Sequence, residues 1–200
     1  MVFSFMKKLT VHILDTNEMS IEDLMKSPYL TSANIKQMNK IGHLLTRKEK
    51  TGSLILKNKY VKDYYVRKDG KPVSDSTFFN VSHSFGVVVI VLSDKSVGID
   101  IEFIRKVDDK MIDYISSKEE KKVITDRKSF FEIWTSKESL LKNLGIGVCT
   151  KMADINCLPI NGMKQYKDKI YKSREEQFKD YIISVTVEDD EPFEMVLKEE

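Results

Sequence analysis

The chain of 200 residues is 41% hydrophobic and 32% charged, which is typical of a soluble globular protein and excludes a disordered one. Its 33 Lys and Arg nearly balance its 31 Asp and Glu, and a net charge of +2 is too small for a dedicated nucleic-acid binder. No apolar run is long enough to cross a bilayer, and the first residues lack the pattern of a signal peptide, so we expect a cytoplasmic protein. Cys149 and Cys157 form no CxxC pair and have no His at zinc-ligand spacing, which predicts free thiols.

The first 65 residues predict one strand followed by helices. Residues 11–14 form a short apolar run with β-branched members, which predicts the strand. Ser20 and Asp23 resemble a capping box, so we expect a helix to begin there. Apolar residues then recur at helical spacing from 34 to about 65, on both sides of a basic cluster made of Arg47, Lys48 and Lys50.

The middle of the chain predicts strands. Residues 69–72 are typical of a turn, and 78–81 indicate a strand that enters the segment 82–84. Residues 87–92 are a continuous β-branched run, which predicts a strand buried on both faces. Because only a four-residue turn separates this run from the next strand, 97–103, we expect the two to form an antiparallel hairpin.

The second half begins with charged helical segments over 110–127, which we expect on the surface. The clearest helix follows at 130–144, where an apolar stripe ends at Gly145. Further strands are predicted at 181–187 and 193–197.

Each half of the chain thus holds helices followed by strands, and no Gly-rich or Pro-rich linker separates the halves. This pattern predicts an α+β fold built as a pseudo-twofold pair of similar α+β subdomains. We place the boundary between them after residue 97, which gives residues 1–97 and 98–200.

Two carboxylates on one predicted strand form the first candidate site. Asp100 and Glu102 are two residues apart, so they point to one face while Ile99 and Ile101 point into a core. Gly98 before them would allow a ligand or another backbone to approach closely. The plainer alternative is a solvated strand face, which is the commoner explanation for a single acid-x-acid pair.

A third carboxylate, Glu138, lies on the predicted helix. With Lys142 four residues later it could form an ordinary surface ion pair, worth a few tenths of a kcal/mol. The functional alternative places Glu138 opposite Asp100 and Glu102, with Lys137 and Lys142 supplying positive charge beside them. Three such carboxylates would suit Mg²⁺, which keeps several waters and shares its coordination shell with substrate phosphates.

His83 stands between Ser82 and Ser84 at the mouth of a predicted strand. A single His is usually structural, but hydroxyl, imidazole and backbone donors here would converge on a phosphate. The turn at Lys71 and Pro72 would add a cation and a rigid flat surface.

Taken together, these pieces resemble the 4′-phosphopantetheinyl transferase family of the surfactin-synthetase-activating (Sfp) type. The motifs that carry the resemblance are Gly70-Lys71-Pro72, FNVSHS at 79–84, GIDIE at 98–102 and FFEIWTSKESLLK at 130–142. The resemblance covers residues 70–187 well and the first 65 residues poorly. It implies a pseudo-twofold fold with coenzyme A bound in the cleft between the subdomains.

The resemblance also implies roles for single residues. Mg²⁺, with Mn²⁺ as the alternative ion, would be held by Asp100, Glu102 and Glu138. Glu138 would also be the candidate base, unless a metal-bound water takes the proton, and Lys142 the cation at the pyrophosphate. The coenzyme A contacts would come from Ser82 and His83 at the phosphates, Lys71 and Pro72 along the nucleotide, Lys137, and Arg47 and Lys50 as the nearest candidates for the 3′-phosphate.

The implied activity is that of a holo-[carrier-protein] synthase, in which a serine of an apo acyl or peptidyl carrier protein takes the phosphopantetheine arm and 3′,5′-ADP leaves. We expect a monomer, because the chain carries both halves of a site, and carrier docking at 110–128 with Met111 and Ile112 exposed to the partner. The alternative is a non-catalytic module that binds coenzyme A or a carrier protein. Fatty-acid, polyketide and peptide pathways all remain open.

Overall fold

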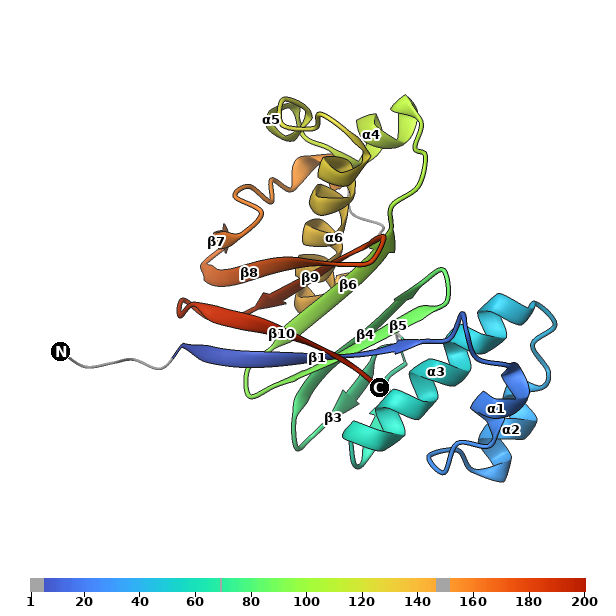
Figure 1. The fold of residues 1–200 in the computed structure, drawn as a ribbon. Helices are drawn as coiled ribbons and strands as arrows, with labels where there is room; N and C mark the ends of the chain where they lie inside the picture. The colour runs from blue at the N-terminus through green and yellow to red at the C-terminus, as the bar shows by residue number, and fades with distance from the viewer. Residues whose placement is uncertain (1–5, 69, 147–151) are drawn as a thin grey trace.

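The structure is a computed structural model, and it describes residues 6–68, 70–146 and 152–200. Two four-stranded sheets each carry one long helix, and a small two-stranded sheet lies beside the first of them (Figure 1). The predicted α+β fold is confirmed. The expectations that concern Asp69 and Cys149 fall outside the described residues, whereas Cys157 is a buried free thiol.

The first sheet has the strand order β10-β1-β5-β4. Its strands are β1 (Lys7–Asp15), β4 (Phe78–Ser84), β5 (Val87–Ser93) and β10 (Phe193–Glu199). β1 runs parallel to β10, and the other pairs are antiparallel. The small sheet joins β2 (Tyr64–Val66) to β3 (Pro72–Ser74).

Three helices lie on the outer side of the first sheet: the longest covers its face, and the two shorter ones pack against the longest. They are α1 (Ile21–Met25), α2 (Ser32–Met38) and α3 (Leu44–Tyr60). The Ser20 hydroxyl accepts a hydrogen bond from the Asp23 N–H at 3.0 Å, so the predicted helix start is confirmed. The single helical pattern that the sequence suggests from 34 to 65 is divided between α2 and α3, because residues 39–43 leave the helix before His43 caps the next one.

The second sheet has the order β6-β9-β8-β7, and all its neighbours are antiparallel. Its strands are β6 (Val97–Phe103), β7 (Gly162–Tyr166), β8 (Lys169–Phe178) and β9 (Tyr181–Val187). The helices of this half are α4 (Asp109–Ile115), α5 (Lys118–Lys121), α6 (Arg127–Leu144) and the 3-10 turn Met152–Asp154. Gly145 ends α6 in a left-handed conformation with φ of 69°, as predicted for a helix stop.

The inner faces of the two sheets form a shared core. Alternate residues of β5 enter different cores: Val87, Val89 and Val91 face the second sheet, whereas Val88 and Ile90 pack under α3. All five are fully buried, which confirms that this strand is covered on both faces.

The predicted hairpin between 87–92 and 97–103 is wrong. Both hydrogen-bonding edges of β5 are occupied, by β1 on one side and β4 on the other, so β6 cannot pair with it. The turn after Ser93 instead carries the chain from the first sheet to the second, where β6 pairs with β9.

The division after residue 97 stays a prediction, and one strand crosses it. β10 leaves the second half and pairs with β1 along the register Lys7 with Phe193 to Ile13 with Glu199. Figure 1 shows this red strand beside the blue one, so the last residues of the chain complete the first sheet.

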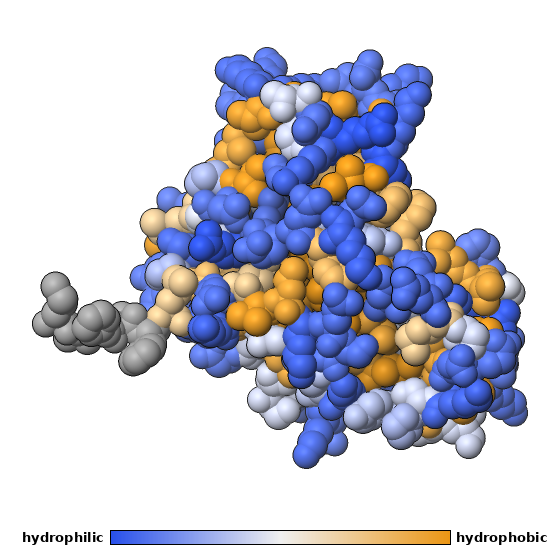
Figure 2. All heavy atoms as spheres, viewed as in Figure 1, coloured by the Kyte–Doolittle hydropathy of each residue, from blue (hydrophilic) through white to orange (hydrophobic). Residues whose placement is uncertain are grey.

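Figure 2 shows hydrophilic residues over most of one face, with separate apolar patches between them. Within the described ranges, no helix combines the length and the apolar composition that a membrane span requires.

Candidate active site

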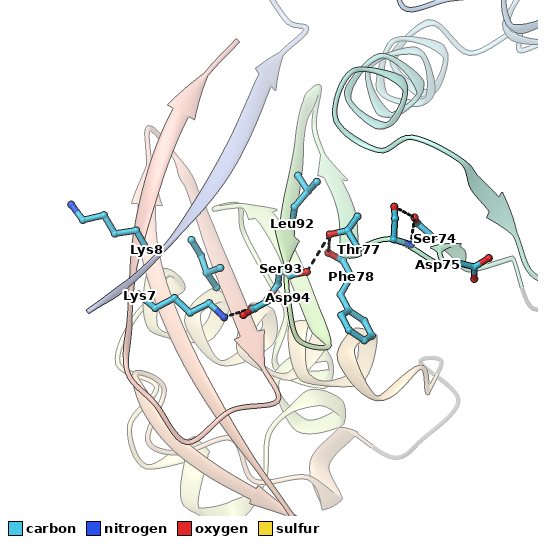
Figure 3. Close-up of a pocket in the computed structure, with 11 residues that line it drawn as sticks. Lys7, Lys8, Ser74, Asp75, Thr77, Phe78, Leu92, Ser93 and Asp94 are labelled. Atoms are coloured by element: carbon cyan, nitrogen blue, oxygen red, sulfur yellow. Dashed lines mark hydrogen bonds and ion pairs between the residues drawn. The ribbon is translucent and has the colours of Figure 1, made fainter. Parts of the chain in front are cut away.

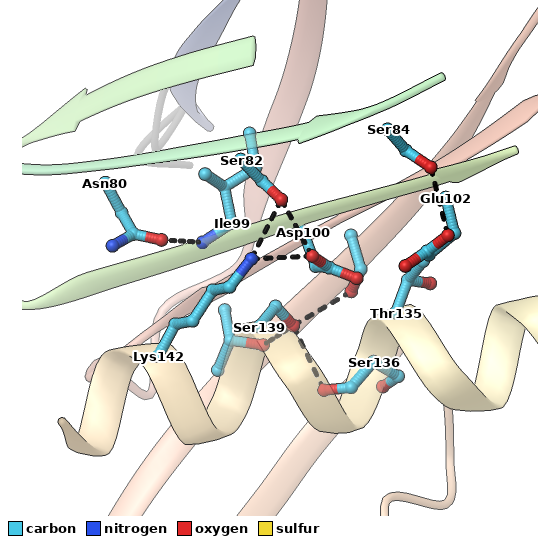
Figure 4. A network of polar contacts seen from close by, with 12 residues as sticks. Asn80, Ser82, Ser84, Ile99, Asp100, Glu102, Thr135, Ser136, Ser139 and Lys142 are labelled. Atoms are coloured by element: carbon cyan, nitrogen blue, oxygen red, sulfur yellow. Dashed lines mark hydrogen bonds and ion pairs between the residues drawn. The ribbon is translucent and has the colours of Figure 1, made fainter. Parts of the chain in front are cut away.

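The candidate site lies where β4 and β6 run side by side without a backbone ladder. Side chains bridge the two strands: the Ile99 N–H donates to Asn80 Oδ1 at 3.0 Å (Figure 4), and the Phe103 N–H donates to Ser84 Oγ at 3.3 Å. A cleft of about 300 Å³ opens along this seam. It is lined by Val81, Ser82, His83, Asp100, Glu102, Trp134, Glu138 and Lys142.

The alternation of β6 is as predicted. Ile99 and Ile101 are fully buried in the shared core, while Asp100 and Glu102 point into the cleft. Gly98 is needed because a Cβ there would collide with the Ser139 carbonyl oxygen on α6. The close approach expected at this glycine is therefore that of the helix backbone, which brings α6 onto β6.

Helix α6 is held in register by polar contacts on its buried side. The Asn143 side-chain amide donates to the carbonyl oxygens of Ser96 and Thr186, both at 2.9 Å. The Ser139 hydroxyl lies 3.1 Å from Ser184 Oγ and 2.8 Å from Thr186 Oγ1. These contacts set the rotation of the helix, and residues 134, 138 and 142, each four apart, then line the cleft together.

Asp100 carries the most informative contacts of the site. One of its oxygens, Oδ1, accepts from Lys142 Nζ at 2.6 Å and from Ser82 Oγ at 2.8 Å. Lys142 also donates to Ser82 Oγ at 2.8 Å, which closes a triangle (Figure 4). The other oxygen, Oδ2, is buried and has no hydrogen-bond partner among the described residues. Burying such an atom without a partner is costly, so Oδ2 is suited to receive a positively charged ligand.

Glu102 is held by a cation that the sequence reasoning missed. Arg105 Nη1 lies 2.8 Å from Glu102 Oε2, and the Ser84 hydroxyl donates to the same oxygen at 3.0 Å. The Arg105 guanidinium also stacks 5.0 Å from the centre of the Phe131 ring and 5.8 Å from that of Trp134. Burial, and then repulsion by Asp100, raises the pKa of Glu102.

Glu138 completes the group of three carboxylates. Its carboxylate makes no hydrogen bond or ion pair with another residue of the described ranges. Burial and then repulsion by Asp100 raise the pKa of Glu138 to about 7, and Lys142 offsets only part of the effect. The cleft therefore gathers more negative charge than its own cations neutralise.

These features fit a hard divalent cation. The donors are carboxylate oxygens, one of them buried and unpaired, and the three groups repel one another. In the described part of the chain, no three acidic, His or Cys side chains already stand as a closed metal cage. Mg²⁺ does not require one, because it commonly keeps several waters and takes only one or two carboxylates directly.

The other predicted coenzyme A contacts are spread around this cleft. Ser82 and His83 line it, whereas Lys71 and Pro72 line an adjacent pocket of about 200 Å³. Lys71 Nζ donates to the Lys142 carbonyl oxygen at 2.9 Å, so this pocket borders the C-terminal end of α6. Arg47 and Lys50 are not among the residues that line either pocket, and their role stays a prediction.

The prediction for Lys137 is wrong. Its side chain is fully buried, its Nζ lies 2.6 Å from Glu120 Oε2, and it donates to the carbonyl oxygens of Ile115 and Met152 at 2.7 Å. On a helix, adjacent residues point about 100° apart, so Lys137 faces away from the cleft that Glu138 lines. It fastens α4, α5 and the turn Met152–Asp154 to α6 and cannot contact coenzyme A.

The predicted exposure of Met111 and Ile112 also needs correction. Both side chains are half-buried and pack against the core beneath α4. The large apolar residues that this region does expose are Tyr114 and Val123, at 58% and 45%.

A larger hollow of about 640 Å³ lies at another edge of the first sheet (Figure 3). Polar contacts line part of it: Lys7 pairs with Asp94 there, and the Thr77 hydroxyl donates to the Ser93 carbonyl oxygen at 3.2 Å. None of the predicted site residues lines it. We therefore assign the site by its chemistry and not by the volume of the hollow.

Sequence reasoning also missed Glu49, whose carboxylate lies 3.3 Å from His83 Nδ1. A signal was present: Glu49 precedes Gly52 by three residues and Leu56 by seven, so helical spacing places it on the buried face of α3. Arg105 follows Glu102 by three residues, but the coil after β6 conceals that they meet.

Comparison with known proteins finds similarity to 4′-phosphopantetheinyl transferases. A family model described as the 4′-phosphopantetheinyl transferase superfamily matches residues 96–186, which hold β6, α6 and β9. The chain is 29% identical over 201 residues to the 4′-phosphopantetheinyl transferase gsp of Aneurinibacillus migulanus, a match that covers 92% of this chain and 76% of that protein. It is 35% identical over 89 residues to the 4′-phosphopantetheinyl transferase psf-1 of Bacillus pumilus, covering 40% of this chain and 38% of the relative.

The fold and the comparisons together define a transferase. More narrowly, residues 96–186 match the model of the 4′-phosphopantetheinyl transferase superfamily, and the resemblance inferred from the motifs of the chain is confirmed.

Proposed function

We propose that this enzyme transfers the 4′-phosphopantetheine arm of coenzyme A to a serine of an apo carrier protein, in a reaction that requires Mg²⁺ and releases 3′,5′-ADP. The observation that carries the proposal is the buried, unpaired Oδ2 of Asp100, in a cleft that Glu102 and Glu138 share. Such a cleft requires a cation, and the phosphates of coenzyme A are the ligands that the cation would share.

The carboxylates of Asp100, Glu102 and Glu138 would hold Mg²⁺, with Mn²⁺ as the alternative ion. When bound, the ion would neutralise negative charge on the pyrophosphate of coenzyme A while its P–O bond breaks. The residues of the chain then divide the remaining work between binding, charge stabilisation and proton transfer.

Lys142 is the cation for the leaving group. Its ammonium lies between Asp100 and Ser82, and its side chain is 30% exposed, so it can reach a pyrophosphate in the cleft. In the reaction the serine Oγ forms a bond to the β-phosphorus, and the bond from that phosphorus to the bridging oxygen breaks. Negative charge accumulates on that oxygen of 3′,5′-ADP, where a lysine stabilises it.

Glu138 is the candidate proton acceptor. Its carboxylate is free of hydrogen bonds to the described residues, and burial raises its pKa to about 7. A bound cation would lower this pKa, so Glu138 would take the proton of the serine hydroxyl near neutral pH only where it is not a direct ligand of the ion. Ser82 and His83, on the opposite wall of the cleft, supply donors for phosphate oxygens.

The nucleotide would extend into the neighbouring pocket of Lys71 and Pro72. Arg47 and Lys50, on α3, remain the candidates for the 3′-phosphate. Lys137 is excluded from this set by its burial.

The carrier protein would dock on α4 and α5, beside the cleft. These helices and the residue after α5 expose Lys110, Lys118, Lys121 and Lys122. The acids Asp109, Asp113 and Glu119 are also exposed there, and Asp113 pairs with Lys121. Carrier proteins that serve fatty-acid, polyketide or peptide synthesis are acidic, so the lysines are the groups that would meet them. Tyr114 and Val123 offer apolar contacts between the charges. We further propose that the enzyme acts as a monomer, because one chain holds every residue of the proposed site. We also propose that it acts in the cytoplasm.

The test is to incubate the enzyme with coenzyme A, Mg²⁺ and a panel of apo acyl and peptidyl carriers, and to weigh each carrier. A gain of one phosphopantetheine arm, lost with Asp100→Asn and Glu138→Gln, is the expected result. If no carrier gains mass while calorimetry shows that coenzyme A still binds, the proposal is wrong and the chain is a binding module.

A further inference from the structure

Glu49 is a buried acid at the back of the candidate site. It is the only acidic residue of α3, where it stands among Arg47, Lys48 and Lys50. Its exposed fraction is 8%. Oε1 accepts a hydrogen bond from the Gly86 N–H at 3.0 Å, and Oε2 lies 3.3 Å from His83 Nδ1. Glu49 thus ties α3 to the β4–β5 hairpin at two points.

The buried carboxylate is ionised. Burial alone would raise the pKa of Glu49, but the His83 imidazole and the Gly86 N–H outweigh burial and hold the pKa below its ordinary value. An ionised carboxylate is costly to bury unless it is paired, so its partners determine why it is there. One partner is a backbone amide, and the other is a side chain that lines the cleft.

We propose that Glu49 is a positioning residue for His83. It keeps the proton on Nδ1, which leaves the opposite ring edge, with Nε2, directed away from α3 and available to the cleft. The His83 side chain is 42% exposed, which is consistent with a ring held on one edge and open on the other. When the ring carries protons on both nitrogens, its Nδ1–H faces Glu49 and its Nε2–H can donate to an anionic oxygen.

The ligand that this arrangement recognises is a phosphate of coenzyme A, so the inference rests on the proposed function. A ring that had rotated would no longer direct Nε2 into the cleft and would lose the bond to phosphate. The contribution of Glu49 is therefore to binding. The bond-breaking step depends on other residues, Lys142 and the three carboxylates.

The central experiment is a double-mutant cycle on Glu49→Gln and His83→Asn. Glutamine keeps an oxygen for the Gly86 N–H but removes the charge that faces Nδ1. We expect each single variant to raise KM for coenzyme A about tenfold, the usual loss for a hydrogen bond to a charged group. We expect kcat and KM for the carrier to change less than about threefold, and the double variant to be no worse than His83→Asn alone.

Glu194→Gln is the matched control, because it removes an acid that pairs with exposed Lys8 at 3.2 Å on β10, and it should leave KM unchanged. If the effects of Glu49→Gln and His83→Asn instead multiply in the double variant, Glu49 acts independently of His83 and the inference is overturned. An unchanged KM in Glu49→Gln overturns it equally.

A second measurement does not require turnover, and it does not depend on whether Glu49→Gln folds. The imidazole ¹⁵N shifts of the wild-type enzyme report the tautomer of its three histidines, and the spectrum of His83→Asn identifies the signal of His83. We expect Nδ1 to carry the proton in the neutral ring. Finding it on Nε2 overturns the inference even if the transferase activity is confirmed, whereas failure of the activity with Nδ1 protonated counts against the proposed function alone.

Discussion

The ammonium of Lys137 lies 2.6 Å from the carboxylate of Glu120, and both side chains are fully buried. The next residue along α6, Glu138, faces a cleft on another side of the same helix. Two adjacent charged residues therefore differ in their surroundings: Lys137 holds neighbouring segments together, and Glu138 belongs to the proposed site.

Lys137→Met is expected to destabilise the protein by about 3 to 5 kcal/mol, because it leaves the Glu120 charge buried without its partner. Urea unfolding measures the free energy of unfolding. Adding Glu120→Gln should recover part of the loss, since the remaining buried group is then neutral. Lys128→Met, which breaks an exposed pair with Glu132, is the control and should change stability by less than about 1 kcal/mol. A mild effect of Lys137→Met would contradict the structural role.

Lys142→Gln should have the opposite profile. Lys142 pairs with the buried Asp100, but its own side chain is 30% exposed and Gln can keep a hydrogen bond to Asp100, so stability should fall by less than in Lys137→Met. By contrast, kcat should fall about 10²- to 10³-fold as the charge on the leaving group loses its cation. Single-turnover assays with a carrier protein measure the loss. A change in KM for coenzyme A with kcat preserved would assign Lys142 to ground-state binding instead.

Gly98→Ala should separate α6 from β6. The new Cβ would overlap the Ser139 carbonyl oxygen and the Asn143 nitrogen, and backbone atoms cannot yield as a flexible side chain can. We expect a loss of more than about 2 kcal/mol in the free energy of unfolding, together with most of the activity. Gly42→Ala is the matched control, because its Cβ would meet no atom within 4 Å. Equal stability of the two variants would contradict the close packing.

Glu200 predicts a pH dependence of stability. Burial would raise its pKa, but Lys59, Tyr60 and His12 outweigh burial and bring the pKa to about 2. Because the folded pKa lies below the unfolded value near 4.5, this stabilisation is present above pH 4.5 and is lost as the pH falls toward 2. Because solvent screens this group, Glu200→Gln should cost about 1 kcal/mol at pH 7 and progressively less below pH 4.5. Thermal unfolding of both proteins across this range measures the difference, and a constant gap would refute the assignment.

Metal binding can be tested without turnover. Mn²⁺ broadens the NMR signals of nearby nuclei, and we expect the affected signals to come from β4, β6 and α6 around the cleft. Asp100→Asn should weaken the effect about tenfold or more, because it removes a charge from the site that holds Oδ2. Broadening that is centred elsewhere, or that persists in this variant, would place the ion outside the three carboxylates.

Much of the site could be predicted from local sequence. The alternation along β6 separates Asp100 and Glu102 from the buried Ile99 and Ile101, because a strand repeats every two residues. The spacing of four places Glu138 and Lys142 on one stripe of α6, and Gly145 marks its end. The motifs at these positions were sufficient to identify the superfamily.

Contacts between segments that are far apart in the chain could not be predicted from local sequence. Helical geometry alone places Lys137 on a different side of α6 from Glu138. Lysines are usually exposed, however, so the sequence gives no reason to expect burial. The burial of Lys137 is explained by its ion pair with Glu120 in the folded protein. The hairpin expected after β5 does not form because β1 and β4 already occupy both edges of β5, and β1 comes from the start of the chain.

What the sequence by itself determined is the chemistry of each element: which face of β6 is acidic, which stripe of α6 is charged, and which family they belong to. What only the tertiary structure decided is which groups meet across elements. Glu49 on helix α3 reaches His83 on strand β4, and Arg105 reaches Glu102 from the coil after β6. The physical reason is that periodicity orients a side chain relative to its own backbone, whereas the partner of a buried charge depends on how separate segments pack.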